Sequence, residues 1–167
     1  QEKQKREKWG KIIKLDSDLK QTLLYEADRI LDADDFSDGR IPRDDSLRVI
    51  KDGRLGCINL DGNEIIKPQY KRIMQFKNGL AIAYNDDDKA GIINKQNEVI
   101  IPFKYDELGS GFCEMLDEKG NSVNCIYAAN EYKNNEKYPD FIVHKFGIIN
   151  DKCEEIIPFE YDDIIMC

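Results

Sequence analysis

The sequence predicts an all-β fold, built as an array of about four three-stranded β-hairpin repeats with little helix. Two observations carry this prediction: a fifteen-residue segment occurs three times without a gap, and short apolar runs alternate with turn residues along the chain. A unit of about 35 residues is too small to close a core by itself. Neighbouring units must therefore stack, either as a curved solenoid or as a propeller-like array.

The repeated segment occupies residues 56–70, 91–105 and 147–161. Each copy has a Gly, an Ile two residues later, an Asn, a polar turn, an Ile-Ile pair and a closing Tyr. We expect three short strands per unit: one before the Gly, one after it and one that carries the Ile pair. A Pro two or three residues before each Tyr removes a backbone donor, so it is expected to end the last strand.

A fourth, degenerate copy begins upstream at Trp9, where Tyr25 follows the Gly by fifteen residues instead of fourteen. The anchor glycines are then Gly10, Gly56, Gly91 and Gly147. Their wider spacings mark insertions, and the larger insertion covers about residues 109–140. Residues 19–31 also fit helical spacing, so a short helix there is the alternative to the strand that the repeat requires.

Turn residues separate the predicted strands. Asp-Gly between apolar runs is a strong signal for a two-residue hairpin. The three candidate turns are Asp52-Gly53, Asp61-Gly62 and Lys119-Gly120. At the place of Gly62 the other copies have Asn97 and Cys153. Because Cys tolerates a positive φ less well than Gly or Asn, the third turn is expected to differ or to be strained.

Joints between units are expected at the repeated Tyr and at the apolar residue three positions beyond it. These apolar residues are Ile73, Leu108 and Ile164. The outermost strands of such an array stay open unless they pair with each other or with a second chain.

A resemblance to a known family follows from these motifs. Trp-Gly, an Ile-rich strand, a polar turn, Ile-Ile-Pro, an aromatic pair and Tyr-Asp together resemble the bacterial WG repeat, and so does the Phe-x-x-Gly-Leu-Ala segment at residues 76–81. The similarity runs from Trp9 to Ile164. The name-giving Trp is kept only at Trp9, and its other places hold Leu55, Ala90 and Phe146. The resemblance implies a β-rich array that binds rather than catalyses, and some such proteins resemble immunity proteins that neutralise secreted toxins.

Charge is distributed unevenly. Residues 1–14 hold six cations and two anions, a net of +4, so the remainder of a chain of net charge −8 carries −12. We expect residues 1–8 to form a basic arm and residues 9–167 to form the repeat domain. The acid excess argues against a nucleic-acid partner, because phosphate neutralisation needs clustered cations.

Location and membrane association are constrained by the cysteines and the apolar runs. The longest apolar runs have four or five residues, which is too short for a membrane span. Five cysteines without a C-x-x-C pair favour a reducing compartment, so a cytoplasmic location is expected. The chain opens on Gln1 rather than Met, so removal of a leader and export is the alternative.

Catalytic and metal-binding motifs are weak. His144 is the single histidine, so any Cys–His or Ser–His arrangement would have to use it. Residues 32–39 resemble a calcium loop, but Phe36 stands where an oxygen ligand is needed. We therefore predict no catalytic residue, no metal and no cofactor, and we expect that the protein is not an enzyme.

The predicted function is non-enzymatic binding of another protein through an acidic surface, with a basic partner favoured by electrostatic steering. Its sharpest form is an immunity protein that neutralises a cognate basic toxin. The alternatives are a structural or assembly domain of a larger bacterial envelope or secreted protein, and a cryptic hydrolase. Acidic loops and loop tyrosines that break the repeat are the candidate contacts. They are Asp34, Asp35, Asp86, Asp87, Asp88, Tyr127, Tyr132 and Tyr138.

Overall fold

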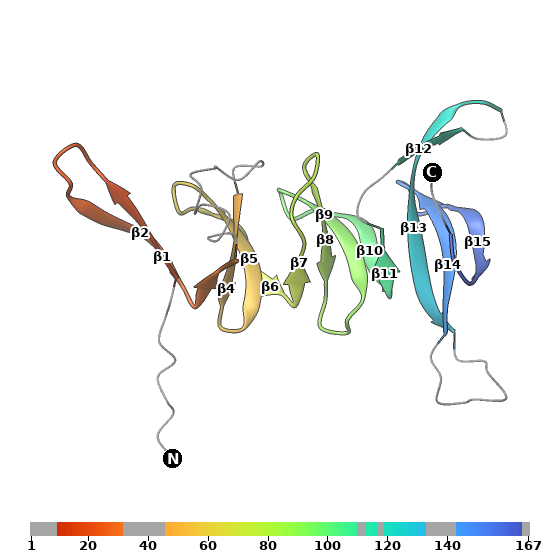
Figure 1. Cartoon of the computed structure of the whole chain (residues 1–167), viewed down its shortest axis with the longest axis horizontal. Coiled ribbons are helices and arrows are strands. Elements are labelled where there is room, and N and C mark those ends of the chain that lie inside the picture. Colours follow the sequence, from red (N-terminus) through yellow and green to blue (C-terminus); the bar gives the residue numbers. More distant parts are fainter. Residues whose placement is uncertain (1–9, 32–45, 110–112, 117–118, 133–142, 165–167) are drawn as a thin grey trace, which may run out of the picture. The chain divides into compact units, whose positions relative to one another are not determined.

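The structure is a computed structural model that describes residues 10–31, 46–109, 113–116, 119–132 and 143–164 (Figure 1). Within these ranges the regular elements are β-strands and no α-helix is present, which confirms the all-β class. The helix alternative for residues 19–31 is wrong. Gln21–Ala27 and Arg29–Ile30 are strands, because Gly10–Leu15 supplies an antiparallel partner that satisfies the backbone of the first of them.

The described residues form fifteen strands in chain order. They are β1 Gly10–Leu15, β2 Gln21–Ala27, β3 Arg29–Ile30, β4 Ser46–Lys51, β5 Arg54–Asn59, β6 Glu64–Tyr70, β7 Arg72–Ile73, β8 Leu80–Tyr84, β9 Ala90–Asn94, β10 Val99–Tyr105, β11 Glu107–Leu108, β12 Cys113–Leu116, β13 Ser122–Tyr132, β14 Val143–Asn150 and β15 Glu155–Tyr161.

These strands form sheets that share one plan. β1 and β2 make a two-stranded sheet, and three larger sheets have the orders β3-β4-β5-β6, β7-β8-β9-β10 and β11-β13-β14-β15, with β12 also paired to β13. Each larger sheet begins with a two-residue strand and continues as an antiparallel meander; in β7 and β11 this short strand carries the expected joint residues Ile73 and Leu108. The sequence pattern did not predict this short additional strand, because two residues are too few for a visible alternation.

The chain divides into two compact units. The first contains the described residues up to Ala81 together with residues 94–98, and the second contains residues 82–93 and the described residues from Val99 onward.

The repeated isoleucines supply the core. In the three full copies the Ile two residues after the anchor Gly is fully buried, and these residues are Ile58, Ile93 and Ile149. In the first unit Ile58 packs with Ala27, Leu47 and Val49. Burial of one such side chain contributes about 1.5–3 kcal/mol of transfer free energy. β8 alternates because one of its faces is buried, whereas the first four residues of β9 are all buried, so both faces of that strand are covered.

The anchor glycines lie opposite a bulge in the neighbouring strand. The β5–β6 register shifts between Leu55 and Cys57, so the opposite strand bends toward Gly56. A Cβ atom at Gly56 would lie 2.5 Å from the carbonyl oxygen of Ile66 and 2.6 Å from the nitrogen of Pro68. A side chain has no room here. The same approach occurs at Gly91 and Gly147.

The expectation that proline ends the third strand of each unit is wrong. β6 continues through Pro68 to Tyr70, and β10 continues through Pro102 to Tyr105. Both are outer strands of their sheets, and their registers shift in the proline region. The missing N–H therefore removes no regular ladder bond, which is the setting in which strands tolerate proline.

The hairpin turns are of two kinds. Asp52 and Gly53 have φ values of 53° and 77°, as a two-residue type I′ turn requires, so this predicted hairpin is confirmed. Asp61-Gly62 instead belongs to a three-residue loop, in which Gly62 (φ 81°) donates its N–H to the carbonyl of Asn59 at 3.0 Å. The predicted two-residue turn is wrong there, because the Asn59 N–H donates to the carbonyl of Asn63 and three residues lie between them.

An Asn side chain stabilises the three-residue loops from inside. The Oδ1 atom of Asn59 accepts hydrogen bonds from two backbone N–H groups, at 3.1 Å and 2.8 Å. Asn94 and Asn150 do the same in their loops. Cys153 takes the left-handed place of Gly62 with a φ of 64°. The third loop therefore keeps the common geometry, at the backbone cost that a non-glycine residue incurs there.

The first hairpin differs from the others in the distance of its Gly from the loop. Gly10 and the loop residue Asp16 lie six residues apart, whereas Gly56 and Asn59 lie three apart. Counted back from the loop, Ile13 stands at the place of Gly56, and the register of β1–β2 shifts between Ile12 and Ile13. The degenerate copy is thus a hairpin extended at its open end.

Candidate functional site

The predicted contact residues separate into described and undescribed groups. Asp86, Asp87 and Asp88 form the turn between β8 and β9 and are exposed. The expectation that Tyr127 and Tyr132 lie on a loop is wrong, because both belong to strand β13, which pairs with β14. The remaining three, Asp34, Asp35 and Tyr138, lie outside the described residues.

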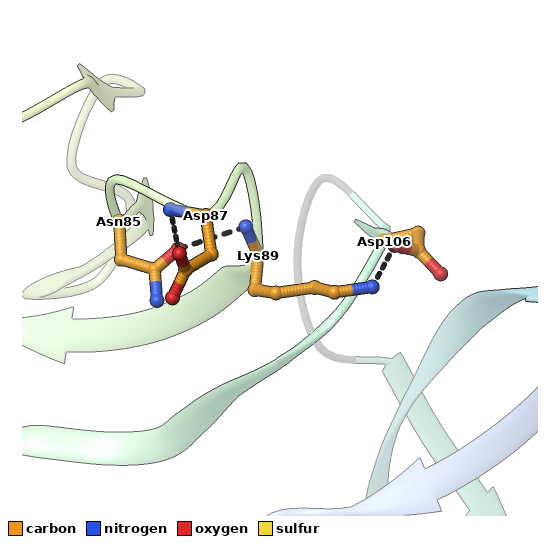
Figure 2. Close-up of polar contacts among 4 residues, drawn as sticks. All are labelled: Asn85, Asp87, Lys89 and Asp106. Carbon is orange, nitrogen blue, oxygen red and sulfur yellow. Dashed lines mark hydrogen bonds and ion pairs between the residues drawn. The ribbon is translucent and has the colours of Figure 1, made fainter.

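The acidic turn is a preorganised loop of the Asn-stabilised kind. Asn85 Oδ1 accepts hydrogen bonds from the backbone N–H groups of Asp87 at 3.0 Å and Lys89 at 2.9 Å (Figure 2). Asp88 has a φ of 60° and donates its N–H to the Asn85 carbonyl at 3.2 Å. The backbone of the turn is thus held by its own hydrogen bonds, so a partner would meet three carboxylates that need little further ordering.

Lys89 connects the acidic turn to the residue that follows β10. Its ammonium forms an ion pair with Asp106, whose side chain is largely buried (Figure 2). The backbone N–H of Asp106 donates to Ala129 of β13 at 2.9 Å. The same pair recurs as Lys145 with Asp162, two residues before the anchor Gly and one after the Tyr. This ion pair therefore belongs to the scaffold of the hairpin.

Tyr127 is a half-buried side chain in close contact with its neighbours. Gly109 lies so near its ring that a Cβ atom there would be 2.5 Å from Cε1. The Phe146 ring lies 6.3 Å away, tilted by 56°. The Tyr127 hydroxyl donates to a carboxylate oxygen of Glu107 at 3.4 Å. Contacts on three sides restrict this ring, which lowers the entropy cost of using it in an interface.

The pKa of Tyr127 links the residues around it. Burial raises this pKa above its usual value, and the negative charge and hydrogen bond of Glu107 raise it further. Tyr84, at the end of β8 just before the acidic turn, is near enough to raise it as well. The Tyr127 phenol therefore remains protonated and able to donate a hydrogen bond at neutral pH.

Together these residues make one surface in the second unit, which we call the acidic–aromatic surface. It consists of Tyr84, Asp86, Asp87, Asp88, Glu107 and Tyr127. Sequence reasoning selected the turn and Tyr127 separately and missed Tyr84 and Glu107. The recurring Lys before the anchor Gly and Asp after the Tyr was the available signal, because that pair ties the turn to the segment that carries Glu107.

The residues considered for chemistry lie apart from this surface. His144 is exposed on β14, opposite Glu131 of β13. No group of three or more metal-ligating side chains occurs in the ranges that the structure describes. Among the described cysteines, Cys57, Cys113, Cys125 and Cys153 form no disulfide bond. The residues that the structure describes include no helix that could span a membrane.

Comparison with known proteins identifies the repeat. The model of the WG containing repeat matches residues 56–88, 91–110 and 146–166. No curated protein and no solved structure is significantly similar to the chain. The matched segments contain the hairpins β5–β6, β9–β10 and β14–β15, with their anchor glycines, Asn-stabilised loops and closing tyrosines. Three segments of this β-rich chain therefore match the WG containing repeat.

Proposed function

We propose that the protein is a non-enzymatic binding module that takes a basic protein partner on its acidic–aromatic surface. The observation that supports this most directly is the contact of Tyr127 with Glu107, next to Asp106, which pairs with Lys89 at the end of the rigid acidic turn. In the three full copies the anchor Gly and the Ile two residues after it are buried and used by the fold, whereas the carboxylates of this surface are exposed.

Charge supports a basic partner. The acidic–aromatic surface contains four exposed carboxylates, those of Asp86, Asp87, Asp88 and Glu107, while Lys89 is engaged with Asp106. Carboxylates gathered on one side attract a cationic patch and raise the association rate. At 0.1 M salt this attraction is screened beyond about 10 Å.

The aromatic residues support a protein ligand. Tyr is enriched at interfaces because one rigid ring supplies both apolar area and a hydroxyl group. Tyr127 is held by Gly109 and Phe146 before any partner arrives. A central tyrosine with a carboxylate rim is a common arrangement of an interface anchor.

We also propose that the hairpins stack as an array of about four units, as a curved solenoid or a propeller-like array. In the first unit, the Tyr70 hydroxyl donates to Oδ1 of Asn97 in the following loop at 2.8 Å. In the second unit, the Tyr105 and Phe159 rings stack with their centroids 5.9 Å apart. Both contacts join one hairpin to the next, which is how a repeat scaffold acquires its core.

The sharpest form of the proposal is an immunity protein that neutralises a cognate toxin. Its test is co-expression with the toxin encoded beside the gene, with growth of the host as the readout. Failure of co-expression to restore growth would contradict the immunity role. Binding of other basic proteins is tested separately by capture.

The capture experiment compares two triple variants of equal charge. In the first, Asp86, Asp87 and Asp88 are each changed to Asn, which tolerates the positive φ at position 88. The control changes three exposed acids of other turns: Asp18→Asn, Asp52→Asn and Asp61→Asn. We expect proteins captured from the native organism at low salt to be lost with the first variant and retained with the control.

Two further outcomes decide against the proposal. Capture that is equal for the two variants, or indifferent to a rise in salt, would contradict an acidic binding surface. Turnover of a hydrolase substrate that disappears in His144→Ala would contradict the non-enzymatic role.

A further inference from the structure

The third repeated hairpin buries less of its outer strand than the first two. β6 and β10 have the same order of buried and exposed positions, and each ends on a buried Tyr. Tyr70 and Tyr105 are 8% and 3% exposed, whereas the equivalent Tyr161 of β15 is 45% exposed. Ile156 of β15 is 46% exposed as well. The same residue types at the same positions therefore lack the cover that their counterparts have.

That cover is the loop of the next hairpin. In the first unit, the left-handed residue Gly62 lies against Leu24 of β2, and Asn97 accepts the hydrogen bond from Tyr70. In the second unit, Cys153 and Tyr105 are near enough to interact electrostatically. Each following loop thus places its left-handed residue on the outer strand of the preceding hairpin, and no such loop covers β15 in the part of the chain that the structure describes.

The first hairpin presents a loop of the same kind. Asp16 Oδ1 accepts hydrogen bonds from the N–H groups of Asp18 at 3.0 Å and Lys20 at 2.9 Å, as the Asn side chains do in the later loops. Leu19 occupies the left-handed place with a φ of 60°. Its side chain is 75% exposed, the largest exposed fraction among the large hydrophobic residues of the described ranges. The exposed Leu19 side chain therefore contributes little packing within its own hairpin.

We propose that copies of this chain associate head to tail, with the Leu19 loop of one copy packed on the β15 face of the next. The occupant of the exposed β15 face is thus a second copy of the chain. The contact continues the joint that already links successive hairpins, with Leu19 at the place of Gly62, Asn97 and Cys153, and with Tyr161 at the place of Tyr70 and Tyr105.

Two further properties of the surfaces fit each other. Ile13 and Leu23 are directly paired across β1 and β2 and are both exposed, so they extend the apolar area beside Leu19. Lys11 and Lys14 on β1 are exposed. Residues 151–164 contain six acids and one Lys, a net of −5. Attraction between these two lysines and the acids beside β15 favours the contact.

The two surfaces of the contact are different, so the association is heterologous. Such contacts build open chains of molecules, or rings where the rotation between copies closes. This inference is independent of the proposed partner, because neither surface includes a residue of the acidic–aromatic surface.

The experiment measures mass by light scattering between about 1 μM and about 1 mM, the range of weak protein association. The wild-type protein should rise above its monomer mass of 19.4 kDa as concentration increases. Leu19→Glu and Tyr161→Glu should each raise the dissociation constant at least about tenfold, as loss of an interface anchor does. Met74→Glu, another exposed apolar residue, is the matched control and should associate like the wild type.

A mixture of the two variants tests the polarity of the contact. Leu19→Glu retains an intact β15 face and Tyr161→Glu retains an intact loop, so an equimolar mixture should form a dimer and nothing larger. All changed side chains are exposed, and circular dichroism checks that each variant is folded. A wild-type mass that stays monomeric throughout the range, or a mixture that stays monomeric while the wild type associates, would overturn the inference.

Discussion

Replacement of Gly56 by Ala should destabilise the protein more than any other change at an anchor of the first unit. The new Cβ atom would meet three backbone atoms: the Ile66 oxygen at 2.5 Å, the Pro68 nitrogen at 2.6 Å and the Lys67 carbonyl carbon at 2.9 Å. These distances are well inside van der Waals contact. Because the atoms belong to the main chain of β6, no side-chain rotation relieves the overlap, and the strand itself must move.

The magnitude follows from the cost of overpacking. Extra methylenes in a packed site typically cost about 1–3 kcal/mol, and a clash with backbone lies at the upper end, so we expect about 3 kcal/mol for Gly56→Ala. The matched control is Gly53→Ala in the same hairpin, where φ is 77° and no atom lies within 4 Å of the new Cβ. Only the left-handed backbone penalty applies there, about 1 kcal/mol after the gain from a less flexible unfolded chain.

Urea unfolding followed by circular dichroism measures both variants. With a denaturant slope of about 2 kcal/mol/M, the midpoint should fall by about 1.5 M for Gly56→Ala and by about 0.5 M for the control. Amide hydrogen exchange in β5 and β6 locates the effect. Equal midpoints for the two variants, or faster exchange outside this sheet only, would refute the explanation of the anchor glycine by close approach of the strands.

Three further changes test the loops and a buried phenol. Asn94→Ala should cost about 1–2 kcal/mol because two backbone N–H groups of the loop lose their acceptor, whereas Asn94→Asp keeps that acceptor but loses the donor to Glu98, so it should recover only part of the loss in the same urea assay. Cys153→Gly should raise the free energy of unfolding by about 0.5–1 kcal/mol, because its φ of 64° suits glycine; a lower melting temperature would contradict this. Burial, followed by the hydrogen bond and the charge of Glu64, raises the pKa of Tyr25 to about 12. The protonated phenol therefore stabilises the fold below pH 10, and this contribution is lost as pH rises from 10 to 12. Ultraviolet titration of Tyr25→Phe should lack one of the late-titrating phenols of the wild type, and an unchanged titration in that variant would count against this assignment.

Part of this fold could be predicted from patterns of neighbouring residues. The threefold recurrence of Gly, buried Ile and turn residues predicts strands and hairpins, because alternation and positive-φ residues act within a few positions of each other. Asp52-Gly53 is the clearest case, since its two residues alone specify the observed turn. The same reasoning placed Cys153 at a position that strains it, and its φ of 64° agrees.

Errors arose where a local rule depends on the position of a strand in its sheet. Pro68 was expected to end a strand, but at the outer edge of the sheet its missing donor breaks no regular ladder bond. Residues 19–31 fitted a helix until β1 provided a partner. The two-residue strands that begin each larger sheet were invisible, because only pairing with the next strand makes Arg72–Ile73 a strand.

The sequence by itself determined that this protein is all-β, that it contains WG-type repeats and that it has an excess of acids, because strand period, turn chemistry and net charge are properties of neighbouring residues. Only the tertiary structure decided which of its many acids lie beside an aromatic residue. Tyr127 meets Glu107 and Tyr84 because β11 pairs with β13 and the Lys89–Asp106 pair ties the acidic turn to the same place. Contacts between residues so far apart in the chain depend on how sheets close over their buried isoleucines, and that closure leaves no local pattern.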